Sequence, residues 1–347
     1  MAQDNNKCEC FACNIPSLDT IKVEKHNGVL SPLSQGVINC LKGELCIENK
    51  GDNHCIIKIK EGAKIEKPIQ IINLLDKTLK SETAITSTDI VLGEDSNITL
   101  IYCDDSLPKT EEKTVHNINV KMPPYSSMAL YKMENVNNFT QISSNIVFDI
   151  DCNAELSTFF ITLNGGKLTN NIRVNFNGEH SSADLNGLYL MDRQQSIETI
   201  VDVFHYKDAC KSNQLFKGIL DDEAKANFWG HILVDYYAKN NDAHQSNNNI
   251  LLTDKAKVST RPILEIYNDD VQCSHGATTG QLDEQALYYM RSRGISEKSA
   301  KMLLMNAFCQ SVIAKSNIQP LKEGLSKMIQ KRLEGGLNYE MPFKIKL

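Results

Sequence analysis

Short apolar runs separated by turn residues extend from Ile21 to Leu264, and they constrain the fold of this chain more than any other feature. The runs are rich in Val, Ile, Leu, Phe and Thr, and Asn, Asp and Gly separate them. Almost none has the 3.6-residue period of an amphipathic helix, which favours strands throughout. Apolar residues alternate with polar ones at Ile172, Val174 and Phe176, at Leu188 and Leu190, at Val201 and Val203, and at Ile232, Val234 and Tyr236. Each of these strands should present one face to a core.

A short internal repeat gives a hint about how the strands are stacked. The tripeptide Leu-Asn-Gly occurs at 163–165 and again at 185–187, a step of 22 residues. Such a step fits one coil of a β-solenoid, in which stacked coils bury a continuous core that no single coil could form. A β-sandwich produces similar strand spacing, so the pattern alone favours the solenoid only slightly.

The period changes to that of helices after Gly280. Apolar residues then share one helical face at Leu282, Ala286, Leu287 and Met290, with Asp283 placed to cap the first turn and Gly294 to end the helix. A second helix should begin at Ser296 and continue to Ile313, and a third should follow Pro320 and end at Gly335-Gly336. We therefore predict a polar tail over 1–20, a mainly β core over 21–280 and a C-terminal α-helical domain over 281–347.

Composition excludes several classes of protein. The hydrophobic fraction of 41% and the charged fraction of 23% are typical of globular proteins, and the 37 basic and 43 acidic residues give a net charge of -6. No basic surface is expected for nucleic acid to bind. No run of about 18 apolar residues could cross a bilayer, and Met1–Lys7 is polar and lacks the apolar segment of a secretory signal. We expect no membrane partner and a cytoplasmic location.

The eleven cysteines are too dispersed to form the disulfide framework of a small secreted domain, so most should be reduced thiols. We expect four of them, Cys46, Cys55, Cys103 and Cys152, to lie in the core, because each is in or beside an apolar strand-like run. Cys8, Cys10 and Cys13 form a C-x-C-x2-C cluster that could bind a metal or sense redox state. Because three thiols without a fourth ligand are a weak signal, we interpret this cluster as part of a polar tail and exclude it from the ligand set.

The stretch from Arg261 to Gly294 contains the most specific chemistry. Cys273 and His275 lie two residues apart where a strand gives way to a helix, so both side chains should leave the same face of the strand. A thiolate and an imidazole both suit iron or an iron–sulfur cluster. Two ligands do not close a metal site, so the others would have to come from elsewhere, including another chain. In the alternative interpretation Cys273 packs in the last coil and His275 hydrogen-bonds the following turn.

Catalytic motifs are absent from the sequence. There is no G-x-x-x-x-G-K-[ST] loop for phosphates, no G-x-S-x-G nucleophile elbow and no H-E-x-x-H helix. We therefore expect no ATP hydrolysis by this chain and no enzymatic activity. One alternative is a β-helix enzyme acting on polysaccharide, which would require a pair of carboxylates on one strand face. The adjacent Asp269 and Asp270 would point to opposite faces and do not fit that requirement.

The stretch from Arg261 to Gly294 closely resembles the C-terminal signature of the SufB/SufD family, the scaffold subunits of the Suf machinery for iron–sulfur cluster assembly. It is more similar to the SufD branch, because SufB-type chains carry an acidic residue near the position of Cys273 and a glutamate at that of Gly276. The resemblance continues through Asp184–Leu188, His205, Cys210–Gly218 and Ala243–Leu252. It covers roughly residues 184–313, whereas the sequence before about residue 150 has only a general solenoid character.

This resemblance implies a right-handed parallel β-helix followed by helices, and a scaffold that pairs with a SufB-like subunit at the C-terminal ends of the two β-helices. His275, and secondarily Cys273, would lie near that interface and take part in building a nascent cluster with a SufB cysteine. The chain would hold no tightly bound cofactor, only a transient iron–sulfur cluster shared with the partner.

The resemblance also implies a docking site for a SufC-like ABC ATPase on the helical hairpin at about 281–315. ATP turnover in that partner would move the two β-helices relative to each other. Four charged residues are candidates for the docking face, although a solvated helix surface would have the same composition: Asp283, Glu284, Arg291 and Arg293. In isolation, the chain is expected to form a two-fold homodimer through its own last coils.

Overall fold

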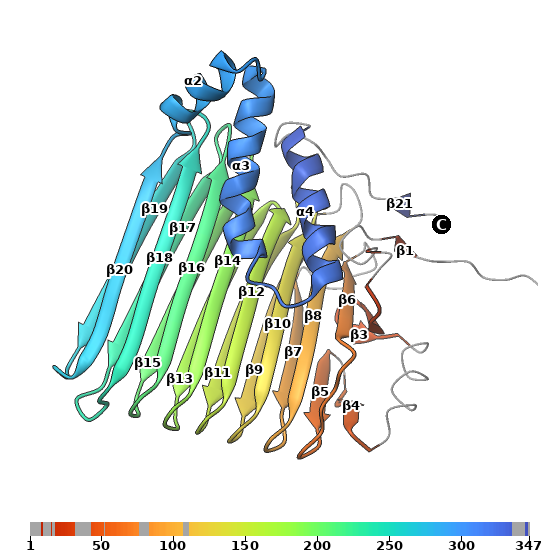
Figure 1. Ribbon diagram of the computed structural model, residues 1–347. Coiled ribbons are helices and arrows are strands. Elements are labelled where there is room, and N and C mark those ends of the chain that lie inside the picture. The colour runs from red at the N-terminus through yellow and green to blue at the C-terminus, as the bar shows by residue number, and fades with distance from the viewer. Residues whose placement is uncertain are drawn as a thin grey trace, which may run out of the picture.

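The computed structural model describes residues 15, 18–31, 43–51, 53–75, 83–106 and 111–334, together with 8–9 and 344–345. Over these residues the chain forms a parallel β-solenoid of about seven turns followed by three helices (Figure 1). Each coil contributes one strand to each of two sheets, so consecutive strands alternate between the sheets. The β-solenoid expected from the sequence is therefore confirmed.

The ten-stranded sheet contains the even-numbered strands and β3, and we call it the even sheet. Its strands are β20 (Val271–Gly280), β18 (Asn241–Leu251), β16 (Lys211–Leu220), β14 (Ser182–Met191), β12 (Glu155–Asn164), β10 (Ser127–Asn135), β8 (Asn97–Ser106), β6 (Ile69–Leu75), β2 (Ile21–His26) and β3 (Val29–Leu30). The nine-stranded odd sheet contains β19 (Lys257–Ile266), β17 (Lys225–Val234), β15 (Ser196–His205), β13 (Lys167–Phe176), β11 (Gln141–Ile150), β9 (Lys113–Met122), β7 (Ala84–Val91), β5 (His54–Ile59) and β4 (Leu45–Asn49). A separate antiparallel pair joins β1 (Cys8–Glu9) to β21 (Lys344–Ile345).

The step from one coil to the next is longer than the tripeptide repeat suggests. Glu155 pairs with Ser182, a step of 27 residues, and Lys211 pairs with Asp242, a step of 31. The two Leu-Asn-Gly copies are not in register, because Asn186 pairs with Phe159 whereas Asn164 pairs with Asn135. The 22-residue step was wrong because turns of different length separate the strands, so a local sequence match does not report the coil.

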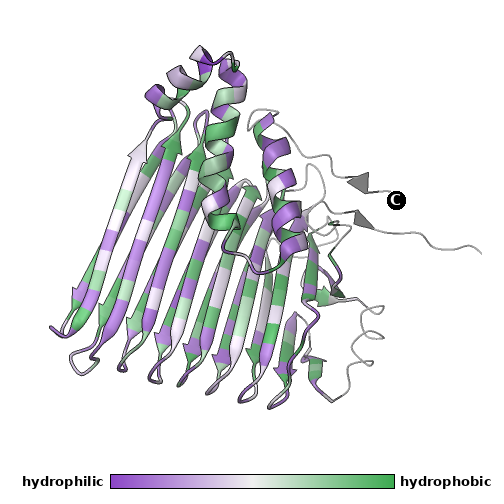
Figure 2. Ribbon diagram, viewed as in Figure 1, coloured by the Kyte–Doolittle hydropathy of each residue, from purple (hydrophilic) through white to green (hydrophobic). Residues whose placement is uncertain are grey.

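Alternating residues of the odd sheet point into the solenoid, as the sequence predicts. Ile172, Val174 and Phe176 in β13, and Val201 and Val203 in β15, belong to one continuous core. Tyr236 was predicted to continue the strand of Ile232 and Val234, but it lies beyond the end of β17 and is 67% exposed. Alternating bands of hydrophilic and hydrophobic residues cross the strands in Figure 2.

Three helices follow β20: α2 (Glu284–Ser292), α3 (Glu297–Ile313) and α4 (Gln319–Glu334). The predicted caps are confirmed: Asp283 accepts hydrogen bonds from the amides of Gln285 and Ala286, Ser296 accepts one from Ser299, and Gly294 adopts a positive φ of 85° after α2.

Helices α3 and α4 cover the outer face of the even sheet (Figure 1). That face is apolar beneath them, with Cys103, Tyr131, Met133, Phe159, Ile161 and Leu188 packed against Met305, Val312, Leu325 and Ile329. Leu188 and Leu190 therefore face the helices rather than the solenoid interior. The buried Arg332 of α4 holds the layers together, because its Nε donates to the Leu163 carbonyl and its Nη2 lies 3.1 Å from Asp192 Oδ1.

Polar groups interrupt the apolar core within the first coils. Lys132 lies between Asp104 and Glu134, and His116 Nε2 lies 3.0 Å from Asp104 Oδ1. All four side chains are almost fully buried. Burial alone would raise the pKa of the Asp104 carboxyl, but His116 and Lys132 hold it well below its usual range. Burial would lower the pKa of Lys132, but the two carboxylates raise it to about 12.

The solenoid has different ends. At the first coils both sheets finish in antiparallel hairpins, β2–β3 and β4–β5. At the last coil, β19 and β20 each have only one sheet neighbour among the described residues, so both leave an open edge. No described helix is long and apolar enough to cross a membrane.

The cysteines are less uniformly buried than we predicted. Cys55 and Cys103 are core residues, whereas Cys46 is exposed and Cys152 is half-buried. Cys46 points out of the short strand β4, and Cys152 lies in the turn before β12, so an apolar neighbourhood in sequence did not determine which way the thiol faces. The Cys8, Cys10 and Cys13 side chains lie outside the described residues.

Candidate functional site

The last strand, β20, presents the predicted pair of residues at the open end of the solenoid. Cys273 and His275 pair with Ala243 and Gln245 of β18, whose side chains point into the solenoid. Because side chains alternate along a strand, Cys273 and His275 both lie on this inner side, as predicted. Cys273 is half-buried against the core, whereas His275 is exposed. The pair therefore forms a step from the packed interior to the solvent at the open end.

The electrostatics of Cys273 favour the neutral thiol in the isolated chain. Burial raises its pKa and the Asp242 carboxylate raises it further, while the amide of Ala243 opposes them. A thiolate at this position would thus require a bound metal or a change of surroundings. Half-burial and contact with the core agree with the alternative interpretation of Cys273 as a packing residue, so its place in the structure does not decide between the two.

The outer side of the same strands carries a separate polar group. His244 Nδ1 lies 2.6 Å from Ser274 Oγ, and His244 Nε2 lies 2.7 Å from Asp242 Oδ1. Since His244 and Ser274 point away from Cys273 and His275, they do not contribute to the same site. Asp269 and Asp270, the carboxylates considered for a polysaccharide-acting enzyme, lie in a bend before β20 rather than on a strand face.

Two buried glutamines behind His275 were missed by the sequence analysis. Gln245 precedes His275 in the stack of coils, and Gln214 precedes Gln245. Both are at most 3% exposed, and neither amide has a hydrogen-bond partner among the described residues. The sequence offered no local signal, because the strands that carry these residues are about 30 residues apart along the chain.

No group of three or more His, Cys, Asp or Glu side chains within the described ranges could hold a metal ion. Cys273 and His275 thus supply at most two ligands, of types that suit iron, and cannot enclose a cluster alone. A cluster built here would be cargo, with its remaining ligands on another molecule.

The four charged residues predicted for the docking face lie at α2 and its ends, and their side chains are exposed. They do not form one uniform charged face. Asp283 caps the helix, Arg291 Nη1 lies 3.6 Å from Glu297 Oε2, and the Arg293 guanidinium lies 5.3 Å from the centre of the Tyr289 ring. Glu284 instead lines a cavity.

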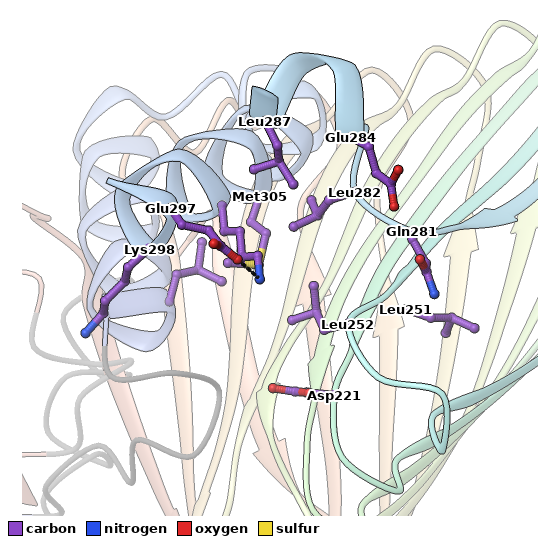
Figure 3. A pocket seen from close by; sticks show the side chains of 12 residues that line it. Asp221, Leu251, Leu252, Gln281, Leu282, Glu284, Leu287, Glu297, Lys298 and Met305 are labelled. Carbon is purple, nitrogen blue, oxygen red and sulfur yellow. Dashed lines mark ion pairs between the residues drawn. The ribbon is translucent and has the colours of Figure 1, made fainter. Parts of the chain in front are cut away.

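That cavity, of about 510 Å³, lies between the helices and the end of the solenoid (Figure 3). Its walls combine leucines with charged residues: Leu251, Leu252, Leu282, Leu287, Met305 and Leu333 with Asp221, Glu284, Glu297, Lys298 and Lys301, and Gln281. Glu297 and Lys301 form an ion pair at 2.9 Å.

Helix α2 buries none of its residues. The apolar face predicted from Leu282, Ala286, Leu287 and Met290 is only half-buried. Tyr288 and Tyr289 on the helix are 76% and 60% exposed. The sequence analysis overlooked this tyrosine pair, although two adjacent aromatics outside the predicted apolar face could have indicated it. Exposed tyrosines are typical of protein interfaces.

Comparison with known proteins identifies the family. The family model described as "SUF system FeS cluster assembly, SufBD core domain" matches residues 75–308, which include the open end and α2. The chain belongs to the SufBD family. Membership gives it a role in iron–sulfur cluster assembly and replaces the polysaccharide-acting alternative.

Individual SufBD relatives agree with the assignment to the SufD branch. The chain is 29% identical over 309 residues to the iron–sulfur cluster assembly protein SufD of Escherichia coli, covering 87% of this chain and 73% of the relative. It is 22% identical to SufD of Bacillus subtilis over 91% of this chain and 69% of the relative. A SufBD family protein of Mycobacterium leprae is 34% identical over 52% of this chain, which spans 48% of that relative.

Proposed function

We propose that the chain is a SufD-like scaffold that pairs with a SufB-like subunit at its open end and carries no catalytic activity of its own. The supporting observation is the last strand, β20, which has an open edge and carries Cys273 and His275 on its inner side. A partner strand laid against this edge would cover both residues. A nascent cluster would then be held between two chains, with His275 as the principal contribution from this one and Cys273 as the second.

The composition of β20 supports pairing along its edge. Proteins usually protect open strand edges with Pro, with charged residues or with bulges. The neighbouring edge strand β19 carries Pro262, Arg261 and Glu265, whereas β20 has no Pro, Asp, Glu, Lys or Arg and ends in small residues from Gly276 to Gly280. Small side chains allow another backbone to approach closely. The same edge can pair with a copy of itself, so the isolated chain should form a two-fold homodimer.

A SufC-like ATPase would dock on α2 and the start of α3. The support is the weak attachment of α2: it buries no residue, exposes Tyr288 and Tyr289, and stands over the 510 Å³ cavity. A helix that packs so little of its surface on its own domain leaves that surface for a partner. Since α2 directly follows β20, movement of the docked ATPase would be transmitted to the strand that carries His275.

Co-purification tests this proposal. The wild-type chain and a His275→Ala variant would each be co-expressed with SufB-like and SufC-like partners from the same organism and reconstituted anaerobically with iron and sulfide. His54→Ala is the matched control, because His54 is also partly exposed but lies in β5 at the opposite end of the solenoid. We expect all three complexes to assemble, with the cluster yield of His275→Ala about tenfold lower or more and that of His54→Ala unchanged.

Each outcome bears on a separate part of the proposal. If no complex forms with either partner, the scaffold function is wrong. If the complex forms and His275→Ala retains its cluster yield, the role of His275 is wrong. Light scattering on the isolated chain provides a further check, since a monomer would contradict the homodimer.

A further inference from the structure

The interior of the solenoid near its open end contains buried amides that its own core does not satisfy. Both side-chain polar atoms of Gln214 and both of Gln245 lack hydrogen-bond partners among the described residues, although these side chains are 0% and 3% exposed. Buried polar groups are nearly always paired, because leaving them unpaired costs stability. Their neighbours are paired: Asn249 Nδ2 donates to Asn247 Oδ1, and Asn247 Nδ2 donates to the Phe216 carbonyl. The two glutamines therefore require a separate explanation.

The register of the strands indicates what these amides serve. Gln214 pairs with Gln245, and Gln245 pairs with His275, so the three side chains stack on the inner side of β16, β18 and β20. Neighbouring strands lie about 4.8 Å apart, a spacing at which stacked amide side chains can hydrogen-bond in a ladder. The ladder leads from the closed core to the exposed imidazole.

The facing sheet leaves room for the Gln245 amide. Gly230 of β17 points inward opposite it, and a Cβ built on Gly230 would lie 1.6 Å from Gln245 Nε2. Any larger residue at position 230 would displace the amide. A glycine that accommodates a buried polar group with no partner is a costly arrangement, which agrees with a functional role for the group.

We propose that Gln245, supported by Gln214, is a positioning residue for His275: its amide oxygen accepts the N–H of one imidazole nitrogen and so presents the other nitrogen to iron. Histidines that bind metals usually donate their second ring N–H to an oxygen, which fixes the tautomer and the ring orientation. This inference rests on the proposed function for the use of His275, but the hydrogen bond itself can be tested without it.

Three variants separate positioning from packing. Gln245→Met keeps the length and removes the acceptor, whereas Gln245→Glu keeps the acceptor. Gly230→Ala leaves Gln245 in the chain but displaces its amide. Gln70→Met is the matched control, because Gln70 is a buried glutamine at the opposite end of the even sheet. Thermal unfolding of every variant confirms that it is folded.

Two readouts are required. The first is the tautomer of His275 in the isolated chain, measured by NMR with ¹⁵N-labelled histidine at alkaline pH, where His275→Ala identifies the signal. The second is the cluster yield of the complex after reconstitution. We expect one tautomer to predominate in wild type, Gln245→Glu and Gln70→Met. In Gln245→Met and Gly230→Ala we expect mixed tautomers and a yield reduced about tenfold.

The outcomes distinguish this inference from the proposed function. If the tautomer is the same in Gln245→Met as in wild type, the positioning role is wrong, whatever happens to the yield. If the tautomer changes but neither Gln245→Met nor His275→Ala alters the yield, the positioning role stands and the proposed function of His275 is wrong. A variant that does not fold is replaced by Gly230→Ala, which retains the glutamine.

Discussion

The two ends of the solenoid interior differ in how they treat buried polar groups. In the first coils, Lys132, Asp104, Glu134 and His116 are charged or titratable groups in mutual contact. In the last coils, the neutral Gln214 and Gln245 are buried without partners among the described residues. The first arrangement satisfies itself within one chain, whereas the second leads to an open edge and to His275. We infer that paired groups hold the fold, and that unpaired groups mark the end that acts on something else.

The comparison has a physical basis. Two opposite charges buried together offset their own desolvation only if both are present, so such a cluster is closed and cannot exchange partners cheaply. A neutral amide costs less to leave unpaired and can gain a partner later. A site that must bind and release cargo can use the second kind of group but not the first.

The largest effect is expected from breaking the charge cluster. Lys132→Met would leave the Asp104 and Glu134 carboxylates buried without their shared cation, and should reduce the free energy of unfolding by about 3–5 kcal/mol. Denaturant unfolding measures the loss. The control is Lys121→Met on the exposed side of the adjacent strand β9, expected to change stability by no more than about 0.5 kcal/mol. A loss below about 1 kcal/mol for Lys132→Met would show that the cluster does not hold the first coils.

A second effect concerns His205, a buried histidine nearer the open end. Its Nδ1 lies 3.0 Å from Asn241 Oδ1 and its Nε2 2.9 Å from Ser212 Oγ, and burial lowers its pKa from 6.5 to about 4. As the pH falls through 6.5 the unfolded chain binds a proton that the folded chain does not. Stability should therefore decline from pH 6.5 down to about 4, by about 3 kcal/mol in total from this group.

Unfolding free energies measured across that pH range test the contribution of His205. The slope should be smaller by that amount in His205→Gln than in wild type, while His54→Gln should keep the wild-type slope. An equal slope in His205→Gln and wild type would mean that another group controls the acid response.

The smallest effect should distinguish paired from unpaired amides directly. Gln214→Leu removes an amide without a described partner and should raise the free energy of unfolding by about 1 kcal/mol. Asn73→Leu should lower it by about 1–3 kcal/mol, because Asn73 accepts from the Gly28 amide at 3.0 Å and donates to Asp104 at 2.9 Å. Opposite signs would support the comparison. A loss in both variants would mean that Gln214 is satisfied in solution, and the distinction between the two ends would fail.

Local features of the chain were predictable from the sequence because they depend on residues close together. The caps Asp283 and Ser296, the break at Gly294 and the inner face of β13 follow from backbone geometry and from side-chain alternation over a few residues. The placement of Cys273 and His275 on one side of a strand has the same origin. The resemblance to a known family supplied the stacking that the alternation alone did not.

Features that depend on which coils are adjacent could not be predicted from the sequence. Alternation is lost in β8 and β12 because α3 and α4 bury the outer face as well, so strands such as Glu155–Asn164 read as continuous apolar runs. Cys46 and Tyr236 were misplaced for a related reason, since a residue near a strand end faces either way until the turn is known.

The sequence by itself determined that this chain is a parallel β-solenoid with C-terminal helices, and that it presents Cys273 and His275 together, because strand period, caps and motif are all local. The tertiary structure alone decided that Gln245 and Gln214 stack behind His275 and that β20 has an open edge. Coil steps vary from 27 to 31 residues, so no fixed period in the sequence reveals the register. Pairing between strands far apart in the chain sets that register, and the register determines which side chains meet.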